Sequence, residues 1–140
     1  MRLHIVARGR IGRGPEAELI ARYVKRIAWP LLLTELPDTG GRAPDALVPA
    51  RTIALDEAGP PMTSAAFAAL LGDWRNSGVR EVRFLIGAAD GLSADDRVAS
   101  DRLLSFGRAT WPHLLVRAML AEQIYRATTI LAGHPYHREG

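Results

Sequence analysis

The stretch TWPHLLVRAMLAEQIYRATTILAGHPYHR, residues 110–138, dominates this sequence. Within residues 114–132 the apolar side chains recur around most of a helix and leave only a narrow polar strip, formed by Arg117, Glu122, Gln123 and Arg126. A helix that is apolar on more than one side has to be covered on more than one side. In a chain of 140 residues, this predicts either the centre of the domain or a helix shared with a second copy.

The end of the same stretch gathers chemically active side chains. It holds three of the four histidines of the chain, and it closes with the cluster His134, Tyr136, His137 and Arg138. The plain alternative is a surface terminus in which Pro135 and Tyr136 pack while the charged groups are solvated. On the residues alone, both interpretations are open.

The composition predicts one globular domain, residues 1–140. Apolar residues make up 48% of the chain and charged residues 24%, which is ordinary for a folded protein. The absence of cysteine excludes disulfides, thiolate metal sites and cysteine nucleophiles. The start does not resemble a signal peptide, and no apolar run reaches the roughly 18 to 20 residues that a membrane helix needs. We therefore expect a cytoplasmic protein with no membrane partner.

The charge balance is compatible with a polyanionic partner. The net charge is +3, and all but one of the 18 basic residues are arginine. Arginine suits phosphate because its planar guanidinium donates hydrogen bonds in pairs. An excess of arginine over lysine also follows from a GC-rich genome, and a net charge does not locate the charges. RNA is one interpretation among others at this point.

Strands and helices alternate along the chain, which predicts an α/β fold with a mainly parallel sheet and helices on both faces. The continuous apolar run at residues 82–86 is typical of a central strand. Residues 38–49 carry turn formers without a period and are predicted to be a loop. The expected strands lie in residues 2–9, 31–37, 51–59, where the strand ends in Leu55 and Asp56, and 81–91, where the strand runs into a loop. The first two expected helices run from Pro15 to before Pro30 and from a cap at Thr63 or Ser64 to about Arg75. The other two run from a cap at Ser93 to about Leu104 and over residues 114–132. Residues 105–113 are expected to form a short strand or a structured loop.

Three strand ends are candidate binding sites, because ligands of open parallel sheets lie at the carboxyl ends of strands. They are Leu55–Asp56, residues 87–91 and residues 110–113. Glycines at positions 87 and 91 would let the backbone approach a ligand closely. Taken singly, each is as well explained as a turn that reverses the chain. Their coincidence with a histidine-rich end favours a site.

The loop after the first strand, GRIGRGP at residues 9–15, has its glycines in the wrong order for a dinucleotide-binding motif. Its arginines, Arg8, Arg10 and Arg13, could touch phosphate. A solvated loop is the plainer interpretation.

Three segments resemble the signature stretches of the RlmH family. They are IGAADGLS at residues 86–93, TWPHLLVRAMLAEQIYRA at residues 110–127 and HPYHRE at residues 134–139. Members of that family are SPOUT-class methyltransferases that modify a pseudouridine in bacterial 23S ribosomal RNA. The resemblance extends in order over nearly the whole chain, and the terminal segment is its most specific part.

The resemblance implies a C-terminal trefoil knot and a homodimer. It also implies S-adenosyl-L-methionine bent into the knot, with the tail of one subunit closing the other subunit's site. By position, His134, Tyr136, His137 and Arg138 would face the RNA base. The cofactor would be held by Leu55, Gly87, Ala88, Arg108, Ala109, Thr110, Trp111, Pro112 and His113.

The implied reaction, methylation of nitrogen 3 of a pseudouridine, is chemically consistent with these residues. Transfer from a sulfonium needs an in-line approach, so positioning supplies much of the rate. The nitrogen must also lose a proton, and histidine, which titrates near neutral pH, is a suitable base. We expect His134 or His137 to be that base and Tyr136 to orient the pseudouridine. Arg138 or Arg117 would hold a phosphate or the developing oxyanion. No metal is expected.

Two features differ from the family pattern. The family usually has a helix between its second and third strands, for which residues 38–49 are too short. It also has paired glycines after the fourth strand, where this chain has Ala88 second. Two alternatives therefore stay open: a SPOUT-fold RNA-binding dimer with weak or no activity, and a SPOUT methyltransferase that acts on tRNA. The sequence does not decide between the histidines, or between assembled ribosomes and free rRNA.

Overall fold

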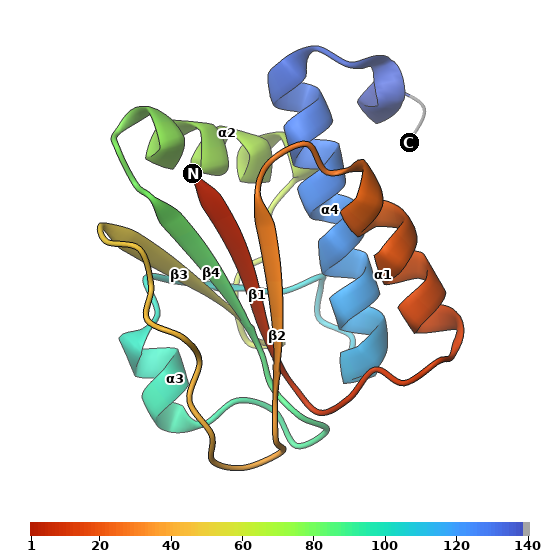
Figure 1. The fold of residues 1–140 in the computed structure, drawn as a ribbon. Coiled ribbons are helices and arrows are strands. Elements are labelled where there is room, and N and C mark those ends of the chain that lie inside the picture. Colours follow the sequence, from red (N-terminus) through yellow and green to blue (C-terminus); the bar gives the residue numbers. More distant parts are fainter. Residues whose placement is uncertain (139–140) are drawn as a thin grey trace.

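A parallel sheet of five strands forms the middle of the molecule (Figure 1). The structure is a computed structural model that describes residues 1–138 and, among these, the side chains of residues 1–136. The spatial order is β2-β1-β4-β3-β5, and every pairing is parallel. The central place of β4 confirms the prediction from its apolar run. The strands are β1 Arg2–Arg8, β2 Leu31–Leu36, β3 Ala50–Leu55, β4 Glu81–Ile86 and β5 Arg102–Leu104.

Helices lie on both faces of the sheet, which confirms the predicted α/β class (Figure 1). Three helices, α1, α2 and α4, cover one face, whereas the short α3 and the loop of residues 37–49 lie on the other. The knot that the resemblance implies stays a prediction. The helices are α1 Pro15–Arg26, α2 Ser64–Asn76, α3 Ala94–Ala99 and α4 His113–Ala132, followed by a 3-10 turn, η1, at Pro135–Arg138.

The loop of residues 37–49 contains no helix, as predicted, and arginine side chains hold it on the sheet. Arg8 donates to the carbonyl oxygens of Pro37 and Gly40 at 2.9 and 2.6 Å. Arg83 donates to the carbonyl oxygen of Pro44. Side chains alternate between the faces of a strand, so Arg8 points away from the α2 and α4 layer into which its neighbour Ala7 packs.

The helix α4 is covered on two sides, which places it at the centre of the domain. Its residues Ala118 and Ala121 pack against Ile20 of α1. Leu120 and Ile124 belong to the main core, which includes the inner faces of α2 and the sheet. The sequence left open a central helix or a helix shared with a second copy. The central position is confirmed, and the sharing stays a prediction.

The predicted helix from Ser93 to about Leu104 is wrong in length. Ser93 does cap a helix, because its side chain accepts a hydrogen bond from the amide of Asp96 at 3.1 Å. The helix nevertheless ends at Ala99, since Asp101 bonds to both the amide and the carbonyl of Thr52 on β3, at 2.7 and 2.9 Å. This contact aligns the next three residues with β3 as strand β5, so residues 105–112 are a loop.

A buried charge cluster lies in the sheet at the amino ends of β1 and β4. The carboxylate of Glu81 is fully buried and pairs with Arg2 and Arg83. His4 is also fully buried, and its Nε2 lies 2.7 Å from the hydroxyl of Thr34. Burial and the positive charge of Arg83 hold the pKa of His4 below its ordinary value. These contacts indicate a structural role for His4.

Candidate active site

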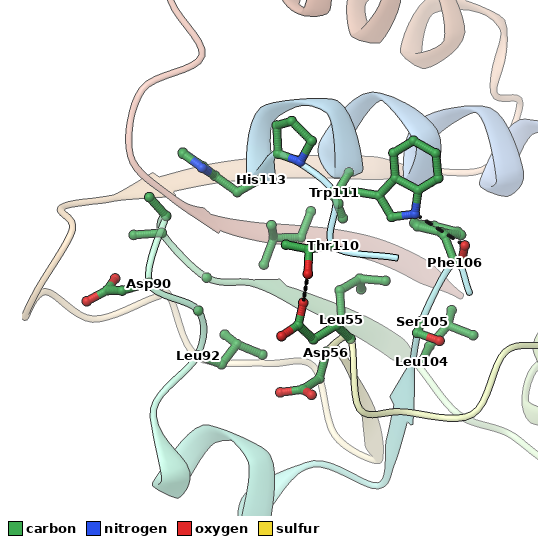
Figure 2. A pocket seen from close by; sticks show the side chains of 18 of the residues that line it. Leu55, Asp56, Asp90, Leu92, Leu104, Ser105, Phe106, Thr110, Trp111 and His113 are labelled. Atoms are coloured by element: carbon green, nitrogen blue, oxygen red, sulfur yellow. Dashed lines mark hydrogen bonds between the residues drawn. The ribbon is translucent and has the colours of Figure 1, made fainter. Parts of the chain in front are cut away.

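A cavity of about 620 Å³ opens at the carboxyl ends of β3, β4 and β5 (Figure 2). Its walls come from the loops that follow these three strands and from the first turn of α4. Open parallel sheets place their ligands at this edge. The volume is within the usual range for small-molecule and cofactor sites.

The loop after β4 forms one wall of the cavity. Its glycines are needed for the conformation of the loop. A side-chain carbon on Gly87 would lie 2.6 Å from the carbonyl oxygen of Gly91 and from the amide nitrogen of Leu92. Gly91 has φ of +89° and bonds back to the carbonyl of Ala88 at 2.9 Å. The sequence interpretation, that Gly87 allows a close approach of a ligand, is therefore incomplete: any larger residue would first collide with its own loop.

Two polar bridges join the walls. Arg97 of α3 pairs with Asp56 at 2.6 Å, and Asp56 is almost completely buried. The hydroxyl of Thr110 donates to the carboxylate of Glu57 at 2.7 Å, which ties the loop after β3 to the loop before α4 (Figure 2). The cavity is thus lined by three carboxylates, those of Asp56, Glu57 and Asp90, although the protein as a whole is basic. They favour a ligand that carries positive charge.

Apolar side chains supply the rest of the lining. Leu55, Ile86 and Leu104 come from the three strand ends, and Val116 comes from α4. Trp111 is 41% exposed at the cavity and donates from its indole nitrogen to the carbonyl of Phe106 at 3.3 Å (Figure 2). An apolar pocket with a few charged groups at its walls suits a ligand that has both a flat apolar part and a cationic part.

Most of the residues predicted to hold a cofactor meet in this cavity. Arg108 is the exception: it is exposed and is not part of the lining. Ala88, the departure from the paired glycines, does line the cavity and is 8% exposed. Their role in binding stays a prediction. The predicted residues that line the cavity are Leu55, Gly87, Ala88, Ala109, Thr110, Trp111, Pro112 and His113.

The structure does not support the predicted direct role of Arg117. Arg117 belongs to the polar strip of α4, but its side chain is fully buried. It donates to the carboxylate of Glu35 at 2.5 Å and to the carbonyl oxygens of Arg8 and Gly9 at 3.3 and 3.1 Å. A guanidinium enclosed in this way cannot meet a phosphate or an oxyanion in the cavity. We correct its role to positioning of the loop after β1.

The predicted catalytic tail lies at the opposite end of α4. A helix of 20 residues is about 30 Å long, so the tail is far from the cavity of its own chain. His134 is exposed, whereas Tyr136 packs on α4: its hydroxyl donates to Glu122 at 3.1 Å, and its ring lies 4.6 Å from that of Tyr125. The side chains of His137 and Arg138 lie outside the part of the chain that the structure describes.

Several lining residues escaped the prediction. Ser105, Phe106 and Gly107 follow β5, which the sequence pattern placed inside a helix. Three residues are too few to show a strand period, so this part could not be found from the pattern. Glu57, on a turn, and Arg97, on the short helix α3, were missed because a single exposed charged residue carries no periodic signal. The acidic Asp56–Glu57 pair directly after a strand was the one available indication.

Two searches of the described residues bear on the expected partners. Within residues 1–138, no helix combines the length and apolar character required to span a membrane. The same part of the chain contains no group of three or more histidine, aspartate or glutamate side chains arranged to hold a metal ion.

Comparison with known proteins identifies close relatives. A family model described as predicted SPOUT methyltransferase matches residues 1–137. A protein named ribosomal RNA large subunit methyltransferase H from Sphingopyxis alaskensis is 65% identical, over 100% of this chain and 99% of the relative. A protein of the same name from Rhizorhabdus wittichii is also 65% identical, over 100% of both.

Solved structures with the same fold are more distant in sequence. A probable methyltransferase from Bordetella pertussis Tohama I has a TM-score of 0.61 at 15% identity, covering 90% of this chain and 95% of that one. A putative methylase family protein from Neisseria gonorrhoeae has a TM-score of 0.60 at 14% identity, covering 89% of this chain and 80% of that one. At such identities these structures support the fold alone.

Proposed function

Because the chain belongs to the SPOUT methyltransferase family and to its ribosomal RNA large subunit methyltransferase H group, we propose that it methylates nitrogen 3 of a pseudouridine in 23S rRNA. S-adenosyl-L-methionine is the proposed donor, and the ribosome in the cytoplasm is the proposed site of action. The observation that carries this proposal is the cavity at the carboxyl edge, lined by most of the residues expected to hold that donor.

The cavity fits S-adenosyl-L-methionine in size and charge. This cofactor supplies an electrophilic methyl group on a positively charged sulfur. The carboxylates of Asp56, Glu57 and Asp90 favour that charge, and the apolar strand ends accommodate a flat base. Arg97 and Thr110 hold two of these carboxylates in place, so the pocket is organised before a ligand arrives.

The distance between cavity and tail favours a homodimer. One chain cannot bring His134 to its own cavity, because the whole of α4 separates them. A second copy can supply its tail if the two chains pack with their α4 helices in contact. The two groups of predicted site residues then form one composite site, and a symmetric dimer contains two such sites.

The hydrogen bonds of the tail favour His137 over His134 as the base. Nδ1 of His134 lies 3.1 Å from the backbone amide of Tyr136, which donates to it. The neutral imidazole then carries its proton on Nε2, so its lone pair is already engaged. His134 is suited to donate a hydrogen bond to the substrate. His137 is left as the proposed acceptor of the proton from nitrogen 3.

Methyl transfer to defined RNAs tests the function. Labelled methyl groups should enter 23S rRNA in ribosomes that lack this modification, and should not enter tRNA. Incorporation only into tRNA would make the chain a tRNA methyltransferase. Binding of RNA without incorporation into any substrate would leave an RNA-binding dimer. Free rRNA, run in parallel, shows whether the assembled ribosome is required.

Mixed dimers test the composite site. Ala109→Trp fills the cavity from an exposed loop, and His137→Ala disables the tail. Each variant should be inactive alone. Mixed in equal amounts and allowed to exchange subunits, they should recover about a quarter of wild-type transfer, because half of the dimers are mixed and each holds one intact site of two. No recovery in mixtures shown by mass spectrometry to contain mixed dimers would contradict a site shared between chains.

A further inference from the structure

The cavity and its rim carry opposite charges. Three carboxylates line the cavity, which suits a cationic donor but repels the phosphates of an RNA strand. A polyanionic substrate therefore needs positive groups at the mouth. The loop of residues 9–14 reaches that mouth: a side-chain carbon on Gly9 would lie 3.9 Å from Nε2 of His113, a residue of the cavity lining.

Hydrogen bonds from Arg117 and to Glu35 hold this loop in place. Arg117 donates to the carbonyl oxygens of Arg8 and Gly9, at the point where the chain leaves β1. Glu35, which pairs with Arg117, also accepts from the amide of Ile11 at 2.8 Å. The beginning and the middle of the loop are thus tied to α4 and β2 by one ion pair. Such a loop presents its side chains in a defined place.

The top of the loop is open and basic. Arg10 and Arg13 are both exposed, and neither forms an ion pair with any side chain among residues 1–136. Between them, a side-chain carbon on Gly12 would meet nothing within 4 Å. Two unpaired guanidinium groups on an open, anchored loop are suited to bind phosphate oxygens.

We propose that residues 9–14 form a phosphate-binding arm of the RNA site. Arg10 and Arg13 bind phosphates that flank the target nucleotide, while buried Arg117 and its partner Glu35 position the arm beside the cavity. This inference rests on the proposed function for the identity of the polyanion. The arm contacts the phosphate backbone of the RNA, so it adds RNA affinity without a preference for base sequence.

The test is RNA affinity as a function of salt. Arg10→Ala/Arg13→Ala should bind a labelled 23S rRNA fragment about 10- to 100-fold more weakly, and an unrelated RNA of equal length to the same degree. The slope of log affinity against log salt should fall by about 2, one for each lost phosphate contact. Affinity for S-adenosyl-L-methionine, measured by calorimetry, should not change, because neither arginine lines the cavity.

A matched control carries the same change of charge. Arg51 and Arg80 are exposed at the amino ends of β3 and β4, on the edge of the sheet away from the cavity. Arg51→Ala/Arg80→Ala should retain wild-type RNA affinity. An equal loss of RNA affinity in both double variants would overturn the proposed phosphate-binding arm, because RNA affinity would then depend only on net charge. Loss of RNA affinity specific to the arm variant, in a protein that methylates no 23S rRNA, would support the arm and refute the proposed function.

Arg117→Lys tests positioning separately from contact. Lysine keeps a charge for Glu35 but loses the paired donors to the carbonyls of Arg8 and Gly9. RNA affinity should fall about 3- to 10-fold with the salt slope unchanged, because no phosphate contact is removed. Wild-type RNA affinity in this variant would mean that the bonds of Arg117 to the loop do not position the arm, and would overturn its positioning role.

Discussion

The two ends of α4 are built in different ways. At the amino end, Arg117 is fully buried and bonded to β2 and to the loop after β1, and strands from three separate parts of the chain enclose the cavity. At the carboxyl end, Gly133 stops the helix with φ of +73°, and Tyr136 folds back along α4 to Glu122, 14 positions earlier. The first end is organised by contacts between several strands and loops, and the second mainly by contacts between α4 and the residues that follow it.

The two ends of α4 therefore differ in what they offer to the residues predicted to hold the cofactor and to those predicted to face the RNA. A cavity needs walls from several elements, so it forms where many strand ends meet. Under the proposed function, the tail needs reach and exposure, which an end of the chain beyond a long helix provides. Because α4 separates the two groups of residues, the proposed site needs a second copy of the chain. Four tests sharpen or break this comparison.

The largest effect is expected for the histidines at the two ends. His137→Ala should lower methyl transfer about 100- to 10,000-fold, the usual contribution of a general base, with the affinity for S-adenosyl-L-methionine nearly intact. His134→Ala should lower transfer less, about 10-fold, since it loses one hydrogen bond. His113→Ala, at the cavity end, should instead weaken cofactor affinity. Rapid-quench transfer and calorimetry measure the two quantities. Equal loss of cofactor affinity in all three would place the tail histidines in the cofactor pocket.

The anchor at the cavity end should dominate stability. Glu35→Ala leaves Arg117 fully buried without its partner, which should lower the free energy of unfolding by about 3 to 5 kcal/mol. Arg117→Met should cost less, about 1 to 3 kcal/mol, because the side chain of Glu35 is 32% exposed and regains water. Urea denaturation measures both. A larger loss for Arg117→Met than for Glu35→Ala would mean that leaving Arg117 buried without its partner is not the more costly change.

The anchor at the tail end should matter less. Tyr136→Phe keeps the ring beside Tyr125 and under the guanidinium of Arg126 and removes the hydroxyl, which bonds to Glu122 and faces Tyr23. We expect a loss of about 1 kcal/mol in the free energy of unfolding. Thermal melts of the Phe and Ala variants separate the hydroxyl from the ring. A loss as large as that of Glu35→Ala would remove the contrast between the two ends.

Acid should weaken the cavity end. Burial opposes the charge of Glu35, but bonds from the amide of Ile11 and from Arg117 outweigh it and hold the pKa of Glu35 below its ordinary value. A lowered pKa adds stability that is present above the unfolded value of 4.5 and is lost as pH falls through the folded value. Exchange of the Ile11 amide should therefore speed up below about pH 4.5 relative to global opening. The pKa of buried Glu81 is also lowered, so Glu35→Gln should remove only part of the fall in global stability.

Local signals explain which parts were predictable. The apolar period of α4, the cap at Ser93 and the apolar run of β4 each act within a few residues, and the structure follows all three. The strand β5 was missed because the bonds of Asp101 to Thr52, 49 positions away, ended a helix that local propensity would have continued. Arg117 was misplaced for the same kind of reason. No pattern along α4 indicates that Glu35 and two backbone carbonyls would enclose it.

By itself, the sequence determined the alternation of strands and helices, the central strand, the buried helix and the chemical content of both of its ends, because these depend on periodicity, caps and residue type. Only the tertiary structure decided that the cavity is acidic within a basic chain, that Arg117 supports a loop instead of facing a ligand, and that about 30 Å of helix separates cavity from tail. Those features depend on contacts between residues that are far apart in the sequence. Such contacts are stabilised by burial and by charge pairing, and neither leaves a pattern in neighbouring residues.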